Sequence, residues 1–134
     1  MEAKRDVPEG LYYTREHEWA RLGSGVVAVG ITEYAAKTLN DVVYLSLPPL
    51  GQDVEQLGTF GTVESIKAVS ELYAPVSGKV TKVNSDLSNH PELVNQSPYQ
   101  DGWIIEITPS NLDQEKGKLL DSRQYADFLA SLDH

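Results

Sequence analysis

The chain has 134 residues, which is the size of one domain, and it contains no cysteine. Disulfides, thiolate nucleophiles and zinc–thiolate sites are therefore excluded, and any dithiol chemistry would have to come from a cofactor. The formal charge of −9 at pH 7 argues against nucleic-acid binding, because that requires a basic surface. The acidic surface suits partners with basic docking faces, although solubility alone would explain it equally well. The histidines lack metal-ligand spacing, so we expect no metal site.

Neither a membrane span nor a secretory signal is visible in the sequence. No segment reaches the roughly 18 apolar residues that a membrane helix needs. The N-terminal segment 1–8 lacks the apolar centre of a signal peptide, and it is too short and too acidic for a transit peptide. We expect a cytoplasmic monomer that binds no membrane, with a processed mitochondrial-matrix form as the alternative.

The first third of the chain carries signals for two strands and a helix. A β-branched run over 25–31 predicts a strand, and Thr32 is predicted to cap a short helix that runs to Leu39. Over 43–47, apolar and polar residues alternate, which is typical of a half-buried strand. This alternation predicts that Val43 faces the core.

Lys67 is expected at the tip of a hairpin. The segments 60–63 and 69–73 have strand patterns, and the piece between them, from Glu64 to Ala68, is predicted to be a turn. Most surface lysines are simply solvated, and a bare lysine is a poor reagent. An amine held out on a rigid hairpin is nevertheless easily reached by a modifying enzyme, and the attached group would then supply the chemistry.

Further strands are predicted over 78–83 and 103–107, separated by loops rich in Gly, Pro, Asn and Ser. Many short strands with such turns indicate a mainly β fold, a small sandwich or flattened barrel with a short internal helix and a C-terminal helix. We expect a single domain over 1–134, with a core at about 12–109 and a helical segment at about 111–134.

The C-terminal helix is predicted to begin after a cap at Asp121 or Ser122 and to cover the barrel with one apolar face. Apolar residues at helical spacing more often indicate core packing than a cofactor site. The face comprises Tyr125, Phe128, Leu129 and Leu132.

The segment around Lys67, Glu-Ser-Ile-Lys-Ala-Val-Ser followed by Leu-Tyr-Ala-Pro-Val-Ser-Gly, resembles the lipoyl-attachment hairpin of glycine cleavage system H proteins. Biotin carriers usually have Met-Lys-Met at this point, and lipoyl domains of 2-oxoacid dehydrogenases have Asp-Lys-Ala. The resemblance covers about 12–129. Where the family commonly has Gly, this chain has Asn40, which tolerates a left-handed backbone better than most residues. Other matching segments are 13–19, 29–35, 42–48 and 93–103.

The resemblance implies a lipoyl-domain-like fold and lipoate attached covalently to Lys67, with Glu64 and Ala68 as its hairpin context. It also implies that the loaded arm folds back into a cleft on the carrier. Glu18 is then a candidate to hold the ammonium of an aminomethyl group from a partly exposed site, with Thr38 lining the same cleft. An ordinary solvated or structural carboxylate remains the alternative for Glu18.

The function implied by the resemblance is that of a carrier, not an enzyme. The arm would take an aminomethyl group from glycine at the pyridoxal-phosphate-dependent decarboxylase and offer it to the tetrahydrofolate-dependent aminomethyltransferase. Dihydrolipoamide dehydrogenase would reoxidise the dithiol, and a lipoate ligase or an octanoyl or lipoyl transferase would load Lys67. Two alternatives remain: a similar carrier or lipoyl donor for another pathway, and an enzyme or interaction module whose Lys67 stays bare.

Overall fold

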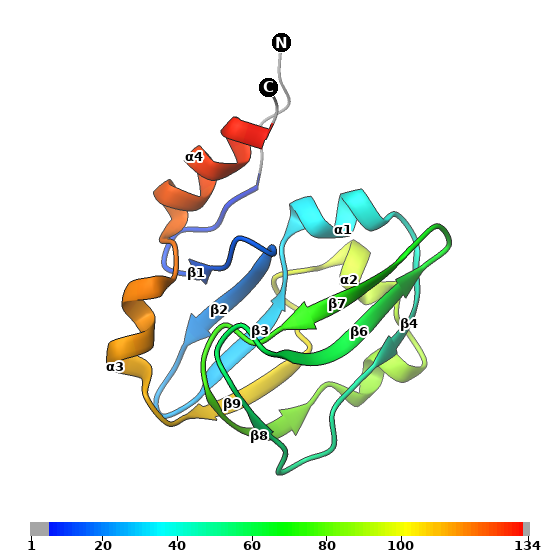
Figure 1. The fold of residues 1–134 in the computed structure, drawn as a ribbon. Helices are drawn as coiled ribbons and strands as arrows, with labels where there is room; N and C mark the ends of the chain where they lie inside the picture. Colours follow the sequence, from blue (N-terminus) through cyan, green and yellow to red (C-terminus); the bar gives the residue numbers. More distant parts are fainter. Residues whose placement is uncertain (1–5, 133–134) are drawn as a thin grey trace.

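The chain folds into two antiparallel sheets in the computed structural model, which describes residues 6–132 (Figure 1). The ends of the expected domain, 1–5 and 133–134, lie outside the described residues. The strand order is β1-β2-β3-β9-β8-β5 in the larger sheet and β4-β6-β7 in the smaller one. The expected mainly β sandwich is thus confirmed, with two open sheets and no closed barrel among residues 6–132.

The bounds of the elements follow the chain. The strands are β1 (Tyr12–Tyr13), β2 (Glu18–Leu22), β3 (Val27–Ile31), β4 (Val42–Ser46), β5 (Asp53–Val54), β6 (Thr59–Ser65), β7 (Val69–Tyr73), β8 (Gly78–Val83) and β9 (Ile105–Pro109). The helices are α1 (Glu33–Leu39), α2 (Leu93–Gln96), α3 (Leu112–Glu115) and α4 (Ser122–Leu132), with short 3₁₀ turns η1 (Ser85–Ser88) and η2 (Lys116–Lys118).

Helix α1 begins and ends as its local sequence predicts. The Thr32 hydroxyl oxygen accepts a hydrogen bond from the Ala35 amide at 3.3 Å, which satisfies one of the free amides of the first turn. The chain leaves the helix at Asn40, whose φ is +62°, so asparagine does occupy the positive-φ position here.

The prediction that Val43 in β4 faces the core is wrong. A β-bulge shifts the register between Val42 and Tyr44, so the alternation of faces is broken at this point. Val42 is buried in place of Val43, which is half exposed at 50%. Leu45 keeps its predicted buried position.

Two strand limits also differ from the prediction. Strand β6 continues through Glu64 to Ser65, so only three residues remain for the turn at Lys67. Strand β9 begins at Ile105 and not at Trp103, because the preceding residues leave a turn before they join the sheet.

The main core is buried between the two sheets, and a second, aromatic cluster packs beside it. In that cluster, Gly30 lies opposite Trp19 in the strand register, and a Cβ there would stand 2.5 Å from the indole ring. This contact makes glycine necessary at the position. The buried residues of the aromatic cluster are Leu11, Tyr13, Trp19, Tyr99, Tyr125 and Leu129.

The C-terminal segment contains three short helical pieces. Asp121 is the cap of α4: its carboxylate accepts from the Gln124 amide at 2.8 Å, while the Gln124 side chain accepts from the Asp121 amide at 2.9 Å. Tyr125 and Leu129 are buried as predicted, but Leu132 is 43% exposed. Helix α4 packs beside β1 with the aromatic cluster, at one end of the larger sheet (Figure 1).

Candidate functional site

Lys67 lies in the three-residue turn between β6 and β7, at the end of the hairpin (Figure 1). The Ser65 hydroxyl oxygen accepts from the amides of Lys67 at 3.3 Å and Ala68 at 3.1 Å. The Ser65 amide donates to the Ala68 carbonyl at 2.8 Å, and the Ile66 amide donates to the Asp41 carbonyl at 3.1 Å. These bonds tie the turn to itself and to the start of β4, so the tip has a defined conformation.

The surroundings of Lys67 leave its amine accessible. The side chain is exposed and makes no ion pair with any residue in 6–132. Ile66 and Val69 are 69% and 63% exposed, which is unusual for large apolar side chains. Glu64 stands opposite Val69 and is itself exposed, whereas the sequence placed it in the turn.

A cleft of about 260 Å³ lies between β2, α1 and the free edge of β7. Glu18 and Thr38 both line this cleft, so the structure brings the two predicted residues together. The Thr38 hydroxyl already donates to the Tyr34 carbonyl at 2.9 Å within α1. The other lining residues are Glu16, His17, Ile31, Tyr34, Ala35, Leu39, Val63, Ser70, Glu71 and Leu72.

Glu18 is buried, which corrects the expectation of a partly exposed carboxylate. Its side chain is 1% exposed. One oxygen accepts from the Thr14 hydroxyl at 2.5 Å and the other from the Tyr73 amide at 3.2 Å. Burial raises the pKa of the Glu18 carboxyl to about 8, against the lowering effect of these two hydrogen bonds. At neutral pH the carboxyl is therefore mostly protonated.

His17 is a cleft residue that the sequence did not single out. It adopts a φ of +73°, a conformation that non-glycine residues rarely take. Burial lowers the pKa of its imidazole below the usual 6.5, so the ring is neutral near pH 7. Its neighbour Glu18 drew attention to this region, but the positive φ of His17 and its place at the cleft are not visible in the sequence.

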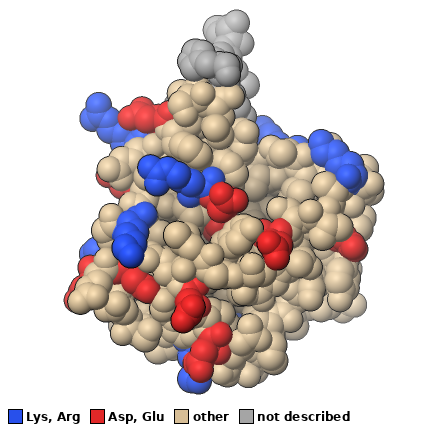
Figure 2. Space-filling view, viewed as in Figure 1, with Lys and Arg blue, Asp and Glu red and all other residues tan. Residues whose placement is uncertain are grey.

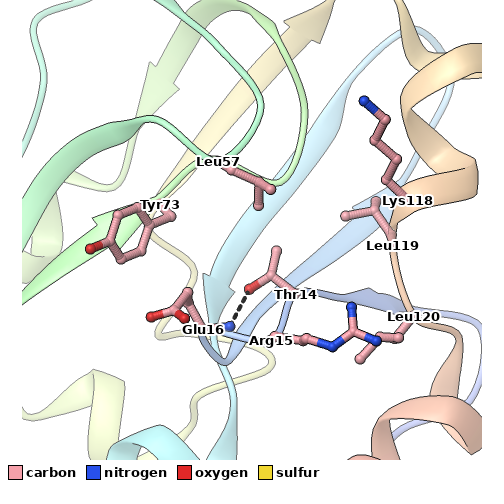
Figure 3. Close-up of a pocket in the computed structure, with 8 residues that line it drawn as sticks. All are labelled: Thr14, Arg15, Glu16, Leu57, Tyr73, Lys118, Leu119 and Leu120. Carbon is pink, nitrogen blue, oxygen red and sulfur yellow. Dashed lines mark hydrogen bonds between the residues drawn. The ribbon is translucent and has the colours of Figure 1, made fainter.

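A second pocket, of about 390 Å³, meets the cleft at Glu16. Figure 3 shows Arg15 and Lys118 on the side of Leu119 and Leu120, with Glu16 and Tyr73 on the opposite side. Neither Glu18 nor Thr38 lines this larger pocket. We therefore assign the candidate arm site to the smaller cleft, which both Glu18 and Thr38 line.

Charges of both signs lie on the face drawn in Figure 2. On the face drawn in Figure 2, Lys and Arg gather mainly over the side of α3 and α4, interspersed with Asp and Glu. Within residues 6–132, no three His, Asp or Glu side chains are grouped as they would be around a metal ion. No helix in the same range is long and apolar enough to cross a membrane.

Comparisons with known proteins agree along nearly the whole chain. The family described as glycine cleavage H-protein matches residues 11–132. The probable glycine cleavage system H protein of Pyrococcus abyssi is 54% identical over 127 residues, which is 94% of each chain. The glycine cleavage system H protein of Anaeromyxobacter sp. (strain K) is 50% identical over 124 residues, covering 92% of this chain and 96% of the relative.

A solved structure has the same fold. The crystal structure of a glycine cleavage system H protein from Mycobacterium marinum superposes with a TM-score of 0.82 at 35% sequence identity, covering 90% of this chain and 97% of that one. Members of this family carry lipoate on a lysine and are carrier subunits without catalytic activity of their own. The chain therefore belongs to the glycine cleavage H-protein family and is a lipoyl carrier of the glycine cleavage system.

Proposed function

We propose that Lys67 is the lysine that bears lipoate in this chain, through an amide on its Nζ atom. The observation that carries this proposal is the exposed side chain at a turn held by Ser65 and, through Ile66, by Asp41. A defined turn gives the loading enzyme a fixed target, and an amine without an ion pair is free to be acylated. Glu64 and Ala68 flank this target on the strand and in the turn.

The cleft is proposed to receive the loaded arm. Ser70 and Leu72 line it and follow Lys67 by three and five residues along the hairpin. At the rise of a strand, these positions are roughly 10 to 17 Å from the tip. The lysine stem extended by the acyl chain of lipoate suits this separation, so the arm can lie along the edge of β7.

Glu18 is proposed to hold the ammonium of the aminomethyl cargo. Without a cationic partner its carboxyl is mostly neutral, because an unpaired buried charge would be unfavourable. A nearby ammonium favours the ionised form and makes a charge-assisted hydrogen bond with it. The cleft also excludes water from the cargo. Thr38 contributes an exposed wall at the end of α1.

We further propose that the whole chain, 1–134, is one carrier domain, with its core at about 12–109 and the helical segment at about 111–134 packed against it. Its partners would be glycine decarboxylase, the aminomethyltransferase, dihydrolipoamide dehydrogenase and a lipoate-attaching ligase or transferase. The tether raises the concentration of the arm at each partner's active site. A role as a lipoyl donor for another pathway is the second candidate, because it uses the same exposed lysine.

The test compares Lys67→Arg with Lys82→Arg, which changes another exposed lysine. After lipoylation, the intact mass should show one lipoyl amide in the parent and in the control variant Lys82→Arg. It should show none in Lys67→Arg. Lipoyl on any other lysine would refute the assignment. Glycine–bicarbonate exchange with the cognate decarboxylase, run with modified and unmodified protein, then separates glycine cleavage from a purely donor role.

A further inference from the structure

His17 is held in place from several sides. Its amide donates to the Thr14 carbonyl at 3.2 Å, and its carbonyl accepts from the Thr32 amide at 2.9 Å. The ring lies 4.5 Å from the Tyr34 ring and 5.9 Å from the Phe128 ring, measured between centroids. Because these contacts keep His17 at a rare positive φ, the position of its side chain is a candidate for a functional role.

The C-terminal helix supplies the contact that orients the ring. The Tyr125 hydroxyl lies 2.8 Å from Nδ1 of His17 and 2.8 Å from the Thr32 hydroxyl oxygen. Tyr125 itself is buried and stacked on Tyr13, with ring centroids 4.5 Å apart. The other ring nitrogen of His17, Nε2, makes no hydrogen bond to any part of the chain that the structure describes.

The direction of these hydrogen bonds follows from the buried Thr32 hydroxyl, which is 0% exposed. Its oxygen accepts from the Ala35 amide, and Tyr125 is the acceptor within reach of its hydrogen. A buried hydroxyl without an acceptor would be unfavourable, so Thr32 donates to Tyr125 and Tyr125 donates to Nδ1 of His17. In a neutral imidazole the proton then resides on Nε2.

We infer that Tyr125 is a positioning residue for the arm cleft: it fixes His17 in the Nε2–H tautomer, so that a neutral N–H donor faces the arm. The inference rests on the proposed function, in which the arm enters this cleft. The two imidazole nitrogens diverge, so with Nδ1 directed at α4 the Nε2–H is left for the cleft that His17 lines. The strongest acceptor of a lipoyl-lysine arm is its amide carbonyl oxygen, since its sulfur atoms accept only weakly.

A neutral donor suits this cargo. An imidazolium beside the ammonium would repel it, and burial lowers the pKa of His17, which disfavours that charge at neutral pH. Four other titratable groups line the cleft. They are Glu16 just before β2, Glu18 in β2, Tyr34 on α1 and Glu71 on β7.

The first experiment uses the unmodified protein. Nitrogen-15 shifts of the His17 ring should show the Nε2–H tautomer in the parent and a mixture of tautomers in Tyr125→Phe. Tyr99→Phe is the matched control, because it removes a hydroxyl group from the same aromatic cluster. The Tyr99 hydroxyl bonds to Asp6 and Glu33 and not to His17. A dominant Nδ1–H tautomer in the parent would overturn the inference.

The second experiment measures the release of ammonia and formaldehyde from aminomethylated protein without the transferase. Tyr125→Phe should release several-fold faster than the parent, and Tyr99→Phe at the parent rate. His17→Phe keeps an aromatic ring but loses Nε2–H, so it should also release faster, and adding Tyr125→Phe to it should change nothing more. Parent-like release from Tyr125→Phe, or additive effects in the double variant, would overturn the inference. Absence of lipoate from Lys67 would instead overturn the proposed function, and the tautomer measurement would be unaffected.

Discussion

The protonated state of Glu18 in the unmodified protein can be tested by Glu18→Gln. Burial raises the pKa of the Glu18 carboxyl from 4.5 to about 8. The folded protein therefore keeps a proton that the unfolded chain releases above pH 4.5. The stability contributed by this proton is fully present below the unfolded pKa and is lost as the pH rises through the folded pKa. Glutamine has nearly the same shape and stays neutral at every pH.

The size of the effect follows from the two pKa values. Each pKa unit corresponds to about 1.4 kcal/mol, and most of the window between the two values lies between pH 5 and pH 8. Over that range the free energy of unfolding of the parent should fall by about 3 kcal/mol relative to Glu18→Gln. The remaining titratable groups are the same in both proteins, so their contributions cancel in the difference.

Urea unfolding of parent and variant at several pH values between 5 and 9 provides the measurement. The difference between the two free energies should change steadily with pH and level off above the folded pKa. Parallel curves would refute the reasoning, because they would mean that Glu18 titrates alike in the folded and unfolded chains. A difference in the free energy of unfolding that is the same at every pH does not support the reasoning, since glutamine also changes the hydrogen bonds to Thr14 and Tyr73.

Two further predictions concern local hydrogen bonds. Ser65→Ala removes the hydroxyl that organises the turn, so lipoylation of Lys67 by the purified ligase should slow several-fold, and an unchanged initial rate would contradict the role of the turn. Asp121→Ala removes the cap of α4 and should lower the free energy of unfolding by about 1 kcal/mol in urea, whereas Asp121→Asn should stay close to the parent. Equal losses in both Asp121 variants would show that the cap is not the cause.

Family membership was predictable because the residues around Lys67 are contiguous and because matching segments follow one another in order. Local features were also predictable from neighbouring residues alone. Thr32 caps α1 through an amide three residues away, and Asp121 does the same for α4. Such contacts span one helical turn, so the sequence carries all the information they need.

The cleft proposed for the arm was predictable only in outline. The resemblance pointed to Glu18 and Thr38, and the structure places both at one cleft. Their environment could not be inferred, because burial depends on what packs over a residue. Glu18 is covered by the end of β7, which lies 55 residues further along the chain at Tyr73, and that contact makes the carboxyl a buried, mostly neutral acid.

The sequence by itself determined the capped helices, the lysine hairpin and the mainly β pattern, since these depend on residues a few positions apart. The sequence also predicted the burial of Leu45, Tyr125 and Leu129, but only the tertiary structure decided that Val43 is exposed and Glu18 is buried. The bulge in β4 turns the side chain of Val43 from the core to the surface, because the register of a strand is set by its partner, here β6. Likewise, His17 and Tyr125 are 108 residues apart, and only the packing of α4 beside β1 brings the hydroxyl to the ring.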